Sequence, residues 1–336
     1  MKRLIYIGNK LETQGASPTA IDILSALLKN EGFNIHTASS EKNQLLRLVD
    51  MLRTIAVNAG KCDLVLIDTY STKNFWYAVL SAHLCRINNL AYIPILHGGN
   101  LEQRLNNNRK ISQELFGKAY CNVAPSQYLM NIFSKHGFEN LKYIPNSIPL
   151  KNYKFKLRRK IEPKIIWVRS FAEVYNPMLA LKILKILLKD FPAAELCMVG
   201  PGKDGSLDIC KKFAKTHHLP VIFSGKLPKE EWLTLASEYG IFLNTSNTDN
   251  TPISVIEAMA LGLPVVSTNV GGIPYLIRDR EHGLLVKKNN EIEAVEAIQF
   301  LINDPGEAQR FSANARQKAE GFDWKRVKDD WVELLS

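Results

Sequence analysis

The sequence predicts an α/β protein built from two doubly wound domains, and three observations support this. The chain has 336 residues, a length that suggests two domains. Short apolar runs alternate with segments whose apolar residues recur at helical spacing, which is the pattern of parallel sheets covered by helices. A strongly basic segment interrupts this alternation near the middle of the chain, and the alternation then begins again.

The first half predicts strands at residues 2–8, 33–38, 64–68, 91–96 and 118–124, with helices at about 18–32, 43–57, 75–85 and 126–136. The loop after the first strand contains Gly15, and a glycine loop of this kind lets a phosphate approach the backbone. The fourth strand is followed by His97-Gly-Gly. Ligands of open α/β sheets collect at the carboxyl ends of strands, so His97 is a candidate site residue. The alternative is a histidine that only caps a turn.

Residues 151–163 are strongly basic and carry no long apolar face, which predicts an interdomain linker with a solvated surface. The expected organisation is therefore a first domain at residues 1–150, this linker, a second domain at residues 164–318 and a terminal amphipathic helix at residues 319–336.

The second half predicts strands at residues 164–168, 195–199, 221–225, 240–243, 264–268 and 283–286. Arg169 follows the first of these strands and precedes a helix that opens at Pro177, where a guanidinium can bind phosphate oxygens. Gly200 begins a Gly-x-Gly-x-x-Gly run, but the next strand ends without the acidic residue that a dinucleotide site requires. We therefore exclude NAD binding at Gly200.

The stretch from Thr248 to Gly262 predicts a helix that starts directly after a buried strand. Thr251 is a suitable N-cap and Pro252 suits the first helical position. The free amides at such a helix start form an anion site. Asp249 and Glu257 lie eight positions apart, so one can reach a ligand at the helix start and the other a group along its side. The alternative is a capped amphipathic helix with two solvated acids.

The run from Asp249 to Glu257, with the Ala-Met-Ala-Leu-Gly-Leu-Pro-Val-Val that follows it, resembles the Glu-x7-Glu motif of the retaining GT4-type glycosyltransferases, also called glycosyl transferases group 1. Asp249 replaces the first Glu of that motif. Residues 142–149 resemble the family's I-P-N-G-V-D hinge, with Ser147 in place of its Gly. The resemblance covers nearly the whole chain and implies the GT-B fold, in which two Rossmann-like doubly wound domains face each other across a cleft.

The resemblance also implies roles for individual residues. Asp249 is expected to contact the donor sugar, Glu257 to bind the ribose hydroxyls of a nucleotide, and His97 to lie near the donor sugar. Arg169 matches the arginine of the family's Gly-Arg-x4-Lys-Gly pattern, whose Arg and Lys hold the diphosphate. Residues 174–176 offer no lysine for this clamp, and Tyr275 stands where the family often has a glutamate.

The expected site therefore combines strand ends with the start of one helix. The expected catalytic residues are His97, Asp249 and Arg169. The expected donor-binding residues are Gly15, Asn146, Arg169, Asn176, Gly200, Asp249, Thr251, Pro252, Ile253, Ser254 and Glu257. The amides of residues 253–255 are expected to face the diphosphate.

We expect transfer without a metal ion or other cofactor, with a nucleotide sugar as co-substrate. The chain contains no Asp-x-Asp motif for a divalent metal. Arg169 and the helix start can instead stabilise the negative charge that develops on the leaving oxygen.

Composition points to the cytoplasm and to an anionic partner. The chain has five cysteines without a Cys-x-x-Cys pair, no uncharged apolar run of membrane-spanning length and no signal-peptide pattern at its start. Residues 1–160 hold 22 Lys and Arg against 10 Asp and Glu, whereas residues 161–336 hold 21 against 23. The basic half suggests lipid headgroups or a phosphate-linked acceptor; the alternative is ordinary lysine-rich solubility. Nucleic acid is not expected, because no aromatic platform accompanies the basic residues.

The expected function is a retaining, metal-independent glycosyltransferase that moves a sugar from a nucleotide sugar to a glycan or lipid-phosphate-linked acceptor. Such a protein would act in cell-surface polysaccharide or glycolipid assembly, in the cytoplasm or at the inner face of the membrane. Two alternatives remain open. One is a GT-B protein that has lost turnover and only binds a nucleotide or glycan, and the other is a sugar-nucleotide epimerase of the same fold.

Overall fold

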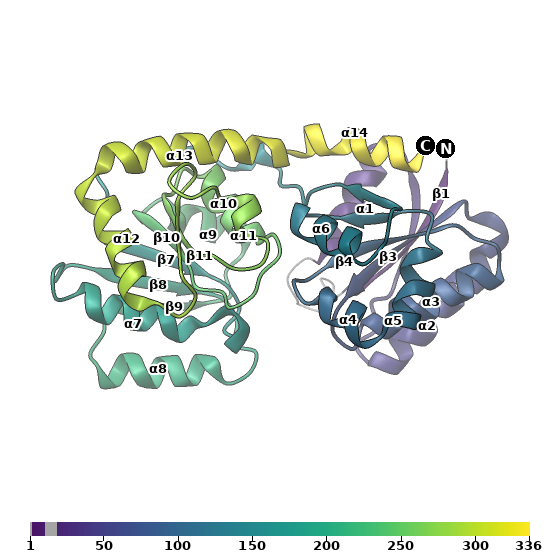
Figure 1. The fold of residues 1–336 in the computed structure, drawn as a ribbon, viewed down its shortest axis with the longest axis horizontal. Helices are drawn as coiled ribbons and strands as arrows, with labels where there is room; N and C mark the ends of the chain where they lie inside the picture. Colours follow the sequence, from purple (N-terminus) through teal and green to yellow (C-terminus); the bar gives the residue numbers. More distant parts are fainter. Residues whose placement is uncertain (1, 11–18) are drawn as a thin grey trace. The chain divides into compact units, whose positions relative to one another are not determined.

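The computed structural model describes residues 2–10 and 19–336, which form two compact units (Figure 1). The first unit extends to Pro145 and also includes Trp324–Ser336, and the second unit is Asn146–Asp323. Each unit contains a six-stranded sheet in which every strand pair is parallel. The predicted α/β class with two Rossmann-like domains is therefore confirmed.

The sheet of the first unit has the strand order β2-β1-β3-β4-β5-β6. Its strands are β1 (Arg3–Ile7), β2 (Asn34–Ala38), β3 (Leu64–Tyr70), β4 (Tyr92–His97), β5 (Asn122–Ala124) and β6 (Leu141–Tyr143). The order reverses between β1 and β3, since the chain proceeds from β1 to one side and later returns to the other. Ligands bind at such a reversal in open α/β sheets.

Helices cover both faces of this sheet. They are α1 (Ala20–Asn30), α2 (Gln44–Asn58), α3 (Phe75–Ile87), α4 (Leu101–Asn107), α5 (Arg109–Ser112), α6 (Gln127–Lys135) and α14 (Trp324–Leu335). Leu28 of α1 and Trp331 of α14 pack in one apolar cluster, while Phe75 of α3 and Phe133 of α6 pack in another. The central strands β1, β3 and β4 are buried along most of their length and are accordingly mostly apolar.

The region after β4 differs most from the expected elements. We expected a strand at residues 118–124, but only the three residues of β5 pair with neighbouring strands. Helices α4 and α5 and a π-helical turn (Gln113–Gly117) precede it, and the sequence analysis did not predict them. Tyr120 is 63% exposed, so the apolar run that suggested a longer strand is not buried throughout.

The sheet of the second unit has the strand order β12-β11-β10-β7-β8-β9. Its strands are β7 (Lys164–Val168), β8 (Glu195–Val199), β9 (Val221–Gly225), β10 (Ile241–Asn244), β11 (Val265–Thr268) and β12 (Leu284–Val286). Counted from β7, this is the 3-2-1-4-5-6 order of nucleotide-binding Rossmann folds, and the order reverses between β7 and β10.

Seven helices among the described residues belong to this unit. They are α7 (Pro177–Leu187), α8 (Ser206–Thr216), α9 (Lys229–Ala236), α10 (Ile253–Ala260), α11 (Ile273–Leu276), α12 (Glu291–Asn303) and α13 (Pro305–Ala319). Leu184 of α7 and Ile298 of α12 pack in one apolar cluster, while Trp232 of α9 and Met259 of α10 pack in another. Figure 1 shows α7 and α8 on one side of the strands and α10 on the other.

The basic segment that we expected to be a solvated linker is packed on the second unit. Arg158 is 7% exposed, and Tyr153 and Ile161 are buried. Arg158 Nε donates to the carbonyl of Tyr239 (2.7 Å), and Nη1 donates to the carbonyl of Gly262 (2.9 Å). Burial lowers the pKa of Arg158 to about 10. The run of basic residues gave no sign that Arg158 is buried, because the carbonyls that accept from Arg158 are distant in sequence.

The terminal helix begins at Trp324 rather than at residue 319. Helix α13 continues to Ala319, and a 3-10 turn (Glu320–Phe322) closes the second unit. Helix α14 packs on the first unit through one apolar face, and Trp324 Nε1 donates to Glu31 of that unit (3.0 Å). No helix of the described part of the chain is long and apolar enough to span a membrane.

Replacing Arg158 by Met is expected to lower the free energy of unfolding by about 3 kcal/mol, because buried carbonyls lose their donor. The neighbouring Arg159 is exposed, and Arg159→Met is a matched control that we expect to change the stability by at most about 0.5 kcal/mol. Urea unfolding followed by circular dichroism measures both variants. Equal stabilities of the two variants would contradict the anchoring role of Arg158.

Candidate active site

The strand reversal of the second unit places two predicted residues side by side. Arg169 follows β7 directly, and Asp249 lies in the loop after β10, the neighbouring strand. Their side chains are 17% and 12% exposed and form an ion pair in which Arg169 Nη2 donates to Asp249 Oδ2. Eighty residues separate the two in sequence, so parallel pairing of β7 with β10 creates this contact.

The ion pair leaves one nitrogen of the guanidinium without a hydrogen-bond partner among the described residues. Asp249 Oδ2 also accepts from Ser246 Oγ (3.1 Å), and Oδ1 accepts from the amide of Asn250 (3.0 Å). The guanidinium carbon of Arg169 lies 4.8 Å from the ring centre of Tyr175. Arg169 Nε is buried and has no hydrogen-bond partner among the described residues. A phosphate oxygen is a suitable acceptor for such a donor.

Glycines hold these loops close together. Gly200 has φ of +147°, and a Cβ there would overlap the carbonyl of Arg169. Gly271 and Gly272 form the turn that packs on the other side of the site. A Cβ on either glycine would overlap the backbone of Asp249 or Asn250, and the amide of Gly272 donates to the carbonyl of Asp249 (3.0 Å). Gly200 thus positions the Arg169 backbone, and the Gly-Gly turn positions the loop that carries Asp249.

Helix α10 starts one residue later than we expected. Pro252, not Thr251, is the N-cap, with extended backbone angles, and Ile253 is the first helical residue. The amide of Val255 donates to the carbonyl of Pro252 (3.1 Å), so it is not available to a ligand as we had expected. The amides of Ile253 and Ser254 have no hydrogen bond within the described part of the chain. These two amides, with the positive end of the helix dipole, form the anion site.

Ser254 adds a hydroxyl to the helix start. The residue is 9% exposed, and its Oγ is buried without a hydrogen-bond partner among the residues described. A buried hydroxyl without a partner is uncommon in folded proteins and costs free energy. Ligand oxygens at the start of α10 would give it a partner.

Glu257 lies one turn further along α10 and is 4% exposed. Its Oε1 accepts from the hydroxyl of Tyr153 (2.8 Å) and forms an ion pair with Nζ of Lys229, the first residue of α9. Burial and the charge of Glu257 raise the pKa of Tyr153, so its hydroxyl stays protonated as a donor. The sequence analysis missed both partners. Lys229 could have been found from its position, because it opens the helix that follows the third strand of this unit.

Other predicted residues lie less directly at this site. Asn176 adopts a left-handed conformation at the start of α7, and its Nδ2 donates to Asn289 Oδ1 (2.7 Å). Asn146 is the first residue of the second unit, and no hydrogen bond of the described residues joins it to Arg169 or Glu257. Gly15 lies outside the described residues.

His97 lies in the first unit, at the carboxyl end of β4. Its Nε2 is 2.7 Å from Oδ1 of Asp68 in β3, and the ring of Tyr70 stacks on it at 4.8 Å between ring centres. The hydroxyl of Tyr6 donates to the same Asp68 oxygen (2.8 Å). Burial and Asp68 raise the pKa of Tyr6. Asp68 therefore fixes the ring orientation of His97 and is a hydrogen-bond acceptor for its Nε2, which leaves Nδ1 for other partners.

The sequence analysis missed Asp68, a polar residue late in an apolar strand. Asp68 is 5% exposed, and its Oδ2 has no partner in the described part of the chain. Gly8, which follows β1, has no room for a Cβ because Asp68 Oδ2 lies against it. A buried carboxylate at the strand reversal of a sheet was a usable signal, since buried acids are costly unless they have a structural or functional partner.

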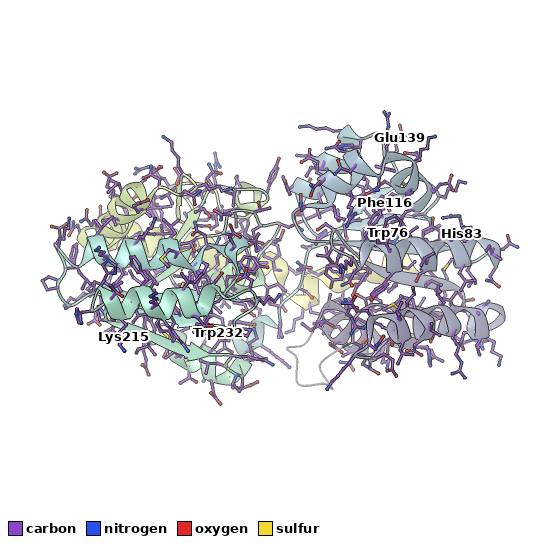
Figure 2. The ribbon with its side chains drawn as sticks, turned by 90° about the horizontal axis from the view of Figure 1, so that it is seen from below. Trp76, His83, Phe116, Glu139, Lys215 and Trp232 are labelled. Atoms are coloured by element: carbon purple, nitrogen blue, oxygen red, sulfur yellow. The ribbon has the colours of Figure 1, made fainter. Side chains whose placement is uncertain are left out.

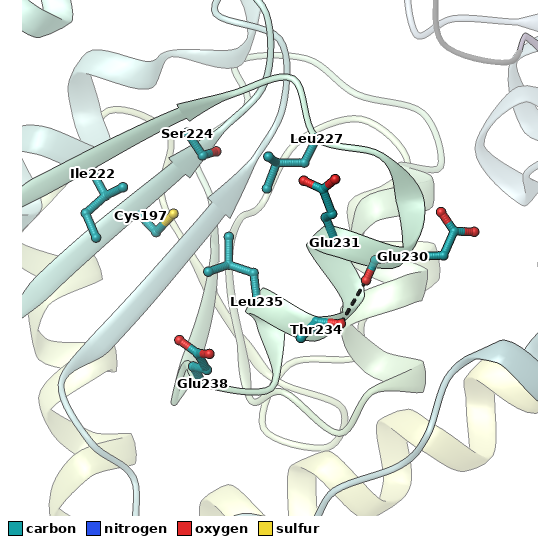
Figure 3. Close-up of a pocket in the computed structure, with 9 residues that line it drawn as sticks. All are labelled: Cys197, Ile222, Ser224, Leu227, Glu230, Glu231, Thr234, Leu235 and Glu238. Carbon is teal, nitrogen blue, oxygen red and sulfur yellow. Dashed lines mark hydrogen bonds between the residues drawn. The ribbon is translucent and has the colours of Figure 1, made fainter.

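A separate groove of about 530 Å³ lies between β9 and α9 (Figure 3). Apolar side chains of Ile222, Leu227 and Leu235 line it, together with three glutamates of the α9 region, Glu230, Glu231 and Glu238. It includes none of the predicted site residues, so the groove is not the candidate active site.

Known proteins resemble this chain in sequence. An uncharacterized glycosyltransferase of Haemophilus influenzae is 29% identical over 193 residues, which are 57% of this chain and 53% of that protein. The sulfoquinovosyl transferase SQD2 of Arabidopsis thaliana is 28% identical over 149 residues, 44% of this chain and 28% of that protein. The matches thus span about half or less of the length of these relatives.

Among solved structures, Alr3699/HepE of Anabaena in complex with UDP and glucose has a TM-score of 0.81 at 17% identity, covering 100% of this chain and 99% of that one. This likeness shows a shared fold. The family model of the glycosyl transferases group 1 matches residues 151–318, which are half of the chain and carry Arg169, Lys229, Asp249 and Glu257. The chain therefore belongs to the glycosyl transferases group 1 family.

Proposed function

We propose that this protein is a retaining, metal-independent glycosyltransferase that moves a sugar from a nucleotide sugar to a glycan or lipid-phosphate-linked acceptor. The observation that carries the proposal is the start of α10, where free amides and the unpartnered Nε of Arg169 meet two acidic side chains at the strand reversal of a Rossmann-like sheet. This combination suits an anionic leaving group that is attached to a sugar.

In this proposal the donor lies along α10. The diphosphate accepts from Arg169 and from the amides of Ile253 and Ser254, which stabilise the negative charge of the departing oxygen. Glu257 accepts from the ribose hydroxyls. Asp249 accepts from hydroxyls of the donor sugar, while its bond to Arg169 keeps both side chains in place. His97 orients the donor sugar or the acceptor through Nδ1, because Asp68 engages Nε2.

Related structures support the choice of a nucleotide-sugar donor. Alr3699/HepE was crystallised with UDP, with UDP and glucose, and with UDP-glucose, and it shares the fold of this chain. The relative from Arabidopsis thaliana is named a sulfoquinovosyl transferase. The base and the sugar that this chain uses are open, so a panel of donors tests them.

Thermal unfolding against UDP-, GDP-, ADP- and TDP-sugars in EDTA tests the donor site. We expect one base to raise the melting temperature, because ligand at roughly a hundred times its dissociation constant stabilises by about 2.7 kcal/mol. Arg169→Ala and Glu257→Ala should remove the shift. The exposed Arg159 of the same unit provides the control, since Arg159→Ala should keep it. If no donor shifts the wild type, the binding-only alternative gains support.

The stereochemistry of donor hydrolysis tests the retaining mechanism without a known acceptor. NMR of the sugar that is first released should show the anomeric configuration of the donor, and the rate should be the same in EDTA as in Mg²⁺. Asp249→Asn should lower this rate with nucleotide binding largely kept, because the first acid acts on the sugar. An inverted first product, or a rate that depends on Mg²⁺, would contradict the proposal.

The acceptor side of the proposal rests on the basic first half. We expect the protein to bind vesicles that contain phosphatidylglycerol at low salt and to leave them at high salt, because screening weakens contacts between exposed charges. Vesicles of phosphatidylcholine alone are the control. Binding that is equal for both vesicle types, or absent from both, would argue against a membrane-linked acceptor and in favour of a free glycan.

A further inference from the structure

The two acids of the candidate site each hold a cation. Asp249 forms its ion pair with Arg169 from the loop after β7, and Glu257 forms its ion pair with Lys229 from the start of α9. Asp249 lies in the loop that precedes α10, and Glu257 lies in the second turn of that helix, eight positions later. A ligand along α10 therefore meets two cations, although only Arg169 was expected.

The loop after β7 offers no second cation. Residues 174–176 occupy the position at which the family pattern has its diphosphate-binding lysine. The ring centre of Tyr175 lies 4.8 Å from the guanidinium carbon of Arg169. Asn176 is engaged with Asn289. An aromatic ring thus supports Arg169 at this position, so a second positive charge for a diphosphate must come from another element.

Lys229 meets the requirements for that charge. Its side chain is 46% exposed, whereas that of its partner Glu257 is 5% exposed, so the lysine can move while the carboxylate stays in place. Glu257 keeps the hydroxyl of Tyr153 as a second donor when the lysine leaves. The Glu257 and Ile253 backbones lie about 6 Å apart along the helix axis, close to the span between a ribose and its phosphates.

We propose that Lys229 is the second cation of the diphosphate site. In the nucleotide-free protein it neutralises Glu257. When ribose hydroxyls donate to Glu257, the ammonium turns to the phosphates and acts there with Arg169. This assignment deepens the proposed function and rests on it, because it requires a nucleoside diphosphate along α10. It predicts a diphosphate clamp that is built from β7 and α9 instead of from a single loop.

Calorimetric titration separates the phosphate contribution from the nucleoside contribution. The probes are UDP, GDP, ADP and TDP, followed by the monophosphate and the nucleoside of the base that binds. Lys229→Met should weaken the diphosphate by about tenfold or more, as expected for a lost charged hydrogen bond. It should leave nucleoside binding unchanged, because Glu257 keeps its contact with the ribose. Lys229→Arg should restore most of the diphosphate affinity.

Lys215 provides the matched control. It is an exposed lysine on α8 of the same unit, labelled in Figure 2 together with Trp232 of α9. Lys215→Met should bind as the wild type does. If Lys229→Met lost equal affinity for the nucleoside and the diphosphate, Lys229 would only support Glu257. If it lost no affinity, Lys229 would have no role in binding. Either result would overturn this inference but not the proposed function. Absence of binding by the wild type would overturn the proposed function as well.

Discussion

The candidate site depends on the need of two buried carboxylates for partners, and each has a positively charged one in the protein without ligand. Asp249 and Glu257 are largely shielded from water, and a buried carboxylate without a partner is strongly unfavourable. Arg169 and Lys229 supply the charges, and they come from the loop after β7 and from the start of α9. The two ion pairs lower the free-energy cost of burying these carboxylates, and they also bring β7, α9 and α10 together. The stability of the second unit and the geometry of its site therefore have a common cause.

Backbone packing makes this arrangement possible. The loops after β7 and β10 approach closely because Gly200 and the Gly271–Gly272 turn carry no side chains. With these loops in place, the first two amides of α10 are left without partners within the described residues. A helix start in this state binds anions well, because its dipole and its free donors act in the same direction. The glycines are thus part of the site although they have no functional groups.

The first unit uses the reversal point of its own sheet in a similar way. Asp68 of β3 lies beside Gly8, which follows β1, and it holds His97 of the next strand in one orientation. Tyr6 shares the same carboxylate oxygen. A histidine oriented by a buried acid has a defined tautomer, so its second nitrogen is presented to a ligand in one protonation state as long as the ring is neutral.

The sequence alone determined the architecture and part of the site. Alternating apolar runs predicted both sheets, because parallel strands must be buried on two faces. Local motifs placed Arg169 after a strand, Asp249 just before a helix and Glu257 inside that helix. Only the tertiary structure decided the partners. Lys229 and Tyr153 meet Glu257, and Arg158 anchors the segment expected to be a linker, through contacts between residues far apart in the chain. Local periodicity carries no information about such contacts, since the packing of distant elements creates them.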